Sequence, residues 1–173
     1  MDIHSSAVMS ILSMLGKQIP AFCILTNLSE DIDDTEHYKH ASRFVTHVVD
    51  ELVYQKVVFP LGVGLKIGYP ALVPADIDGV VFAGYGHYNP FGYGYYASKS
   101  HPGVYKLGPA PSKQKRHDDS DAVLVDEGHI TLLPITNDIS LQNFADNHKF
   151  IEDIKNVVEQ INPKWDASNN ERL

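Results

Sequence analysis

Apolar positions in the first half of the chain predict a helix, a strand, a second helix and a second strand. Residues 5–16 carry apolar side chains at helical spacing behind two serines that suit an N-cap. The continuous apolar run 21–25 is typical of a strand buried on both faces. Residues 35–54 predict an amphipathic helix, and 65–69 predict a strand that returns parallel to the first through a right-handed crossover.

The second half of the chain predicts a different arrangement. Residues 80–82 indicate a short strand, and a tract rich in glycine, tyrosine and proline follows at 84–96. Residues 105–107 and the stretch 122–135 predict strand pairs, with Glu127-Gly128 as a hairpin bend. We therefore expect β-hairpins here rather than a further strand and helix repeat.

Helical spacing returns near the C-terminus and sets the expected domain limits. We predict one domain over 1–140, an amphipathic helix over 141–164 that stops near Pro163, and a disordered tail over 165–173.

Composition narrows the functional classes. The chain has 173 residues, is 43% hydrophobic and carries a net charge of -8, which argues against a nucleic-acid polymer as partner because phosphate-backbone binding needs excess positive charge. No apolar stretch reaches the roughly 20 residues of a membrane span, and the N-terminus lacks a basic secretory region, so we expect a cytoplasmic protein without membrane contact. The one cysteine, Cys23, lies in an apolar run and is predicted to be buried and inert.

Four groups of segments follow each other in an order that resembles a known family. They are 4–8 with 19–21, Pro60 with 64–70, 94–96 with 105–108, and 120–122 with 128–135. In this order they resemble the C-terminal half of the SurE family, nucleotidases that remove phosphate from nucleoside monophosphates. The last group is the most specific, because it is close to the family's Thr-Asp-x-x-Ala and Gly-Tyr-Val-Ser-Val-Thr-Pro-Leu segments. The resemblance implies an α/β fold, with a partial SurE-like Rossmann-type sheet, a β-hairpin extension and a C-terminal helix.

The same resemblance implies a divalent metal cofactor, Mg²⁺ or Mn²⁺, but not where this chain would hold it. In the family an Asn-Asp-Asp-Gly motif holds the ion, and neither this motif nor the family's metal-binding serine and asparagine loop has a counterpart among these 173 residues. The adjacent pairs Asp33-Asp34 and Asp118-Asp119 lie in polar loops and are predicted to be solvated. We therefore assign no catalytic residue and no metal ligand within this chain.

Some residues at positions equivalent to the family's site could still contact a phosphate. Ser5 and Ser6 lie where the family presents a helix N-terminus to its substrate, and an anion is favoured there. A simple N-cap is the alternative. Lys66 and Gly68 stand where the family has two asparagines, so polar roles of those asparagines do not transfer.

Two other groups of side chains have both a functional and a structural interpretation. The histidines of the second predicted helix, His37, His40 and His47, could bind zinc or copper with nearby glutamates, or could be solvated on the helix surface. The aromatic residues of 85–96 could stack on a nucleobase, or could serve hairpin packing or an oligomer contact.

Three functional hypotheses remain open from sequence. The first is a SurE-like phosphomonoester hydrolase acting on nucleotides or related esters, inactive alone because its metal motif is missing. The second is a non-catalytic assembly module, or pseudo-enzyme, that pairs with a partner chain. The third is a truncated gene product of an active enzyme. SurE proteins commonly associate through hairpin arms, so we also expect a homo-oligomer formed through 122–135.

Overall fold

The computed structural model describes residues 6–26, 34–84, 91–111, 119–136 and 144–162. The elements, in chain order, are α1 (Ser6–Gly16), β1 (Phe22–Thr26), α2 (Asp34–Tyr54), β2 (Val63–Tyr69), the 3-10 turn Pro74–Asp76, β3 (Val80–Phe82), β4 (Phe91–Ala97), β5 (Tyr105–Pro111), α3 (Asp121–Asp126), β6 (Ile130–Thr136) and α4 (Phe144–Ile161). The predicted first helix, both early strands and the long second helix are therefore confirmed. None of the described helices combines the length and apolar character needed to cross a membrane.

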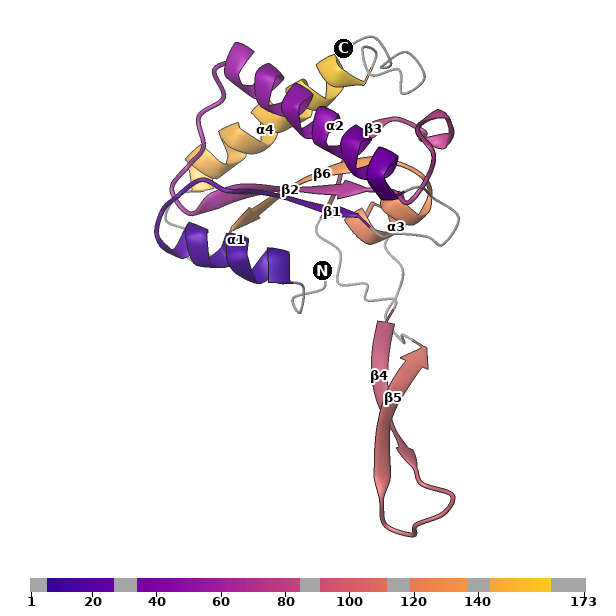
Figure 1. Ribbon diagram of the computed structural model, residues 1–173. Helices are drawn as coiled ribbons and strands as arrows, with labels where there is room; N and C mark the ends of the chain where they lie inside the picture. Colours follow the sequence, from indigo (N-terminus) through magenta and orange to yellow (C-terminus); the bar gives the residue numbers. More distant parts are fainter. Residues whose placement is uncertain (1–5, 27–33, 85–90, 112–118, 137–143, 163–173) are drawn as a thin grey trace.

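A four-stranded mixed sheet forms the centre of the molecule, in the order β1-β2-β6-β3. β1 and β2 are parallel, as predicted, whereas β6 runs antiparallel to β2 and parallel to β3. Helices α2 and α4 cover one face, and α1 and α3 cover the other (Figure 1). This α/β arrangement confirms the predicted fold class.

β2 divides the core into two parts because its side chains alternate between the faces of the sheet. Leu65, Ile67 and Tyr69 are fully buried in the larger cluster under α2 and α4. Gly64, Lys66 and Gly68 therefore lie on the opposite face, beneath α1 and α3. That second face carries a buried charged side chain, Lys66, which is unusual in a core.

β4 and β5 form an antiparallel hairpin that projects away from the sheet (Figure 1). The register places Tyr95 opposite Leu107 and Ala97 opposite Tyr105. The aromatic tract thus contributes a hairpin strand at 91–97, while residues 85–90 lie outside the described residues. The predicted tail 165–173 also lies outside them.

The predicted hairpin over 122–135 is wrong. Asp121–Asp126 is the helix α3, and Ile130–Thr136 is β6, the strand between β2 and β3. The apolar run 122–125 is too short for periodicity to separate a helix from a strand. Gly128 adopts a positive φ of 97° and ends the helix, with its N–H donating to the Val125 carbonyl at 3.1 Å. Because β6 is internal to the sheet, 122–135 is not a free arm for an oligomer.

Candidate functional site

A buried ion pair joins the sheet to α3. The Nζ atom of Lys66 on β2 donates to Oδ2 of Asp121, the first residue of α3. Their side chains are only 8% and 5% exposed. Taking both charges out of water is costly, so each depends on the other for compensation. The pair fixes the position of α3 over the sheet.

Two hydroxyl groups on this face are buried without a partner among the described residues. Ser120 precedes α3 and Thr131 lies on β6, and both residues are 0% exposed. A Cβ atom at Gly68 would lie 2.5 Å from Oγ1 of Thr131. Gly68 therefore provides the space that the Thr131 side chain occupies. The Lys66–Asp121 ion pair and the hydroxyls of Ser120 and Thr131 therefore lie together on one face of the sheet, and they form the most polar part of the described core.

Cys23 lies next to Lys66 in the β1-β2 register. Burial raises the pKa of its thiol, and the positive charge of Lys66 partly offsets that rise. A buried thiol with a raised pKa is a poor nucleophile at neutral pH. The expectation of a buried cysteine is confirmed.

The start of α1 lies on this same face. Leu15 and Ile11 approach Gly64 near the start of β2, and the first turn of the helix extends from there toward α3 (Figure 1). Ser6 begins the helix, whereas Ser5 lies outside the described residues. Their phosphate-binding role stays a prediction.

The carboxyl ends of β1 and β2 form a second polar cluster, on the opposite face. Oγ1 of Thr26 lies 2.5 Å from Nε2 of His37, and the His37 ring packs edge-on against Tyr69 at 5.3 Å between centroids. His37 is buried, so the interpretation as a solvated surface histidine is wrong for this residue. Burial raises the pKa of Tyr69 to about 12, and its hydroxyl has no partner among the described residues.

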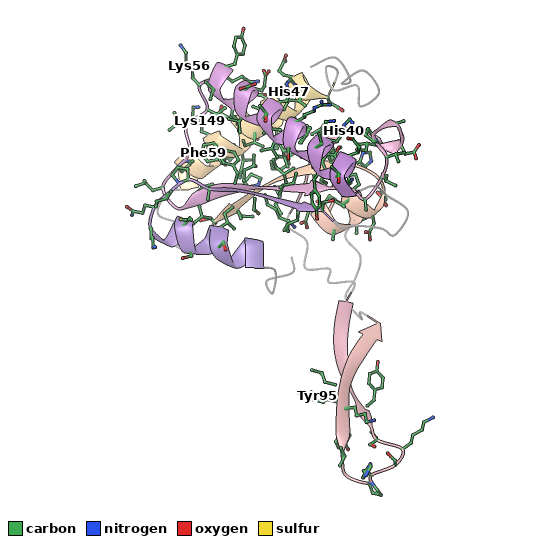
Figure 2. The ribbon with its side chains drawn as sticks, viewed as in Figure 1. His40, His47, Lys56, Phe59, Tyr95 and Lys149 are labelled. Carbon is green, nitrogen blue, oxygen red and sulfur yellow. The ribbon has the colours of Figure 1, made fainter. Side chains whose placement is uncertain are left out.

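The described residues do not provide a metal site. No group of three or more histidine, cysteine, aspartate or glutamate side chains is gathered there. Asp121 is bound by Lys66, and the side chains of Asp33, Asp34 and Asp118 lie outside what the structure describes. His40 and His47 lie on the same flank of α2 but do not complete such a group within the described ranges (Figure 2). The described side chains by themselves therefore do not gather the ligands of a divalent cation.

Sequence reasoning missed the ion pair. The sequence did indicate a buried charge, because Lys66 interrupts an apolar strand. Its neighbours Leu65 and Ile67 are both buried. A lysine at such a position needs an anionic partner. Which carboxylate it would find could not be predicted without knowing that α3 packs over β2.

Comparison with known proteins supports the architecture alone. No protein-family model matches this sequence, and no curated protein matches it. Among solved structures, a similar fold is that of the SurE protein from Aquifex aeolicus. The TM-score is 0.61 at 14% sequence identity, and the match covers 86% of this chain. This chain spans only 58% of the Aquifex chain.

Proposed function

We propose that this chain is the C-terminal part of a SurE-type phosphomonoester hydrolase that acts on nucleotides or related esters. The observation that carries the proposal is the SurE-like fold over 86% of the chain, found in a sequence whose short segments follow the order of that family. Because the described residues do not fit a divalent cation, the proposal assigns the Mg²⁺ or Mn²⁺ ligands to a segment outside them. That segment could belong to the same polypeptide or to a partner chain.

In this proposal the chain supplies the phosphate side of the site. The first turn of α1 has N–H groups without helical acceptors, and the helix dipole favours an anion there. We assign the phosphate contact to Ser5 and Ser6, which stand at this position in the sequence. In the same proposal, the Lys66–Asp121 pair has a structural role and holds α3 against β2.

Two measurements on the purified chain test these assignments. With p-nitrophenyl phosphate or a nucleoside monophosphate and Mn²⁺, we expect no chelator-sensitive hydrolysis. Turnover abolished by EDTA would show that the chain holds its own metal. In an NMR titration with inorganic phosphate, we expect amide shifts at residues 5–8, with chloride at equal ionic strength as control. Equal shifts with both salts would contradict the phosphate site.

One observation favours the second hypothesis, an assembly module. Tyr95, Tyr105 and Leu107 lie on one face of the β4-β5 hairpin and are 76%, 66% and 61% exposed. An exposed aromatic face on a projecting hairpin is typical of a protein contact. Sedimentation of the chain and of a Tyr95→Ser, Leu107→Ser variant tests this. An oligomer that the variant loses supports assembly through the hairpin, and identical sedimentation of both proteins contradicts it.

A further inference from the structure

Two loops lie together at one end of the central sheet. β1 and β2 are parallel, so the loop 17–21 before β1 and the loop 55–62 before β2 lie at the same end, at the left of Figure 1. The Phe59 ring lies 5.1 Å from the Phe22 ring and 4.6 Å from the Phe150 ring, measured between centroids. These contacts anchor the second loop to β1 and to α4.

Helix α2 enters its loop through a turn that glycine usually occupies. The Val57 N–H donates to the Leu52 carbonyl at 3.0 Å, and the Lys56 N–H donates to the Val53 carbonyl at 3.1 Å. Lys56 has a positive φ of 54°, and Gln18 holds the same place after α1 with a φ of 60°. Glycine is the common residue at this position of a helix end. Both loops thus carry an exposed polar side chain where glycine would be less strained.

Apolar side chains project from these loops into solvent. Tyr54 is 82% exposed, Val58 74% and Leu61 60% in the second loop and the helix end before it. Ile19 in the first loop is 47% exposed. Side chains exposed to this degree make little contact with their own protein, so they project from the surface rather than line a groove. A group of projecting apolar side chains indicates a surface that contacts a partner.

The charge at this end is positive, although the whole chain is acidic. The stretches 3–29 and 52–75 contain no aspartate or glutamate, and Lys17 and Lys56 are exposed within them. The exposed Asp50 lies one turn earlier on α2. Lys149 of α4 also lies at this end (Figure 2), where it pairs with Asp153 at 2.6 Å. The two loops therefore offer lysines without a carboxylate of their own.

We propose that this end of the molecule binds the surface of an anionic lipid bilayer. The side chains assigned to this contact, which we call the loop-end surface, are Lys17, Ile19, Tyr54, Lys56, Val58 and Leu61. Apolar and aromatic side chains enter the boundary between head groups and acyl chains, and adjacent lysines attract anionic head groups. Projecting side chains suit a lipid surface better than a protein partner, because the core of a protein interface is closely packed and complementary in shape.

A contact of this kind leaves the rest of the molecule accessible. Ligands of open α/β sheets bind at the carboxyl ends of the strands, and these ends of β1 and β2 lie opposite the loop-end surface. The inference goes beyond the proposed function and does not depend on it. It replaces the expectation of no membrane contact, because surface binding requires exposed side chains rather than a spanning segment.

Co-sedimentation with lipid vesicles tests the proposal. The purified chain is mixed with vesicles of phosphatidylcholine alone, or of phosphatidylcholine with phosphatidylserine. We expect binding to the vesicles that contain phosphatidylserine, and we expect it to weaken as salt is added, since salt screens exposed charges. Equal binding to both kinds of vesicle, or binding to neither, would overturn the proposal.

A matched pair of variants tests the apolar part of the surface. Val58→Ser shortens a projecting apolar side chain, and Val73→Ser makes the same change beyond the other end of β2, where Val73 is 48% exposed. We expect Val58→Ser to reduce vesicle binding about tenfold and Val73→Ser to leave it unchanged. Equal binding by the two variants would contradict insertion of this loop. An oligomer that Val58→Ser loses in sedimentation without lipid, together with no vesicle binding, would assign the surface to a second copy and overturn the proposal.

The variant Lys56→Gly separates lipid binding from folding, because its two expected effects have opposite signs. Glycine suits a φ of 54° better than lysine does, so the urea midpoint should rise. Loss of one lysine beside an anionic surface should reduce vesicle binding about fivefold. Lys99→Gln in the exposed hairpin loop is the control and should bind as the unchanged chain does. Undiminished binding by Lys56→Gly would contradict the role assigned to this lysine.

Discussion

Replacing Lys66 with methionine would leave the Asp121 carboxylate buried without a cation. The two side chains are 8% and 5% exposed, so water cannot substitute for the lost partner. Removing one member of a buried pair costs about 3–5 kcal/mol. A domain of this size has a total stability of about 5–15 kcal/mol, so we expect Lys66→Met to lose a large part of it.

The double variant Lys66→Met, Asp121→Leu distinguishes lost charge compensation from lost packing. Exchanging a whole buried pair for apolar residues of similar volume is often neutral or stabilising. We therefore expect the double variant to be more stable than Lys66→Met alone, although it carries one more substitution.

Urea unfolding followed by circular dichroism measures both effects. The slope of unfolding free energy against urea should stay constant across the variants, since a changed slope would indicate a changed unfolded state. A loss below about 1 kcal/mol for Lys66→Met is the size expected of a surface ion pair. That result, or a double variant less stable than the single one, would refute the reasoning.

Three further predictions concern single residues. Gly68→Ala should reduce the free energy of unfolding in urea by about 1–3 kcal/mol, because the new methyl group would lie 2.5 Å from Oγ1 of Thr131. An added Thr131→Ala substitution should recover part of this loss. No recovery would exclude this clash as the cause. Tyr69 has a pKa of about 12 in the folded protein, against about 10 for exposed tyrosine, so the unfolded state loses its proton first and stability should fall as pH rises between these values. Tyr69→Phe should reduce this fall, and an unchanged pH profile would contradict the assignment. Asn162→Ala should cost about 1 kcal/mol in thermal or urea unfolding, because it removes the acceptor of the Val80 N–H, and an unaltered midpoint would show that water replaces it.

The early elements could be predicted because their apolar patterns are long or unambiguous. The helix at 35–54 presents five turns of consistent spacing, and the run at 21–25 has the character of a buried strand. Their parallel relation to β2 follows from the handedness of crossover connections. These elements depend on local sequence and one general rule.

Residues 120–136 could not be predicted in the same way, because tertiary packing decides them. The apolar residues after Asp121 fit either a strand or a short helix, and in the structure they form a helix whose first residue binds Lys66 across the sheet. His37 presented a similar problem. Its place on an amphipathic helix indicated a surface residue, but α2 is rotated so that the imidazole reaches Thr26 at the end of β1. Lys66 signals that an anionic partner is needed, but the identity of that partner and the rotation of α2 are decided outside the local sequence.

The position of β6 in the sheet has a consequence for how the polypeptide reaches its native state. β3 pairs only with β6 among the described strands, and β6 is also the strand that connects β3 to β2. During synthesis, Val80 therefore leaves the ribosome well before Ile130, the residue it pairs with. Until then, only β1 and β2 of this sheet can pair with each other. A chain that stopped before Ile130 would leave β3 without its partner strand, so it would not form a smaller version of this domain.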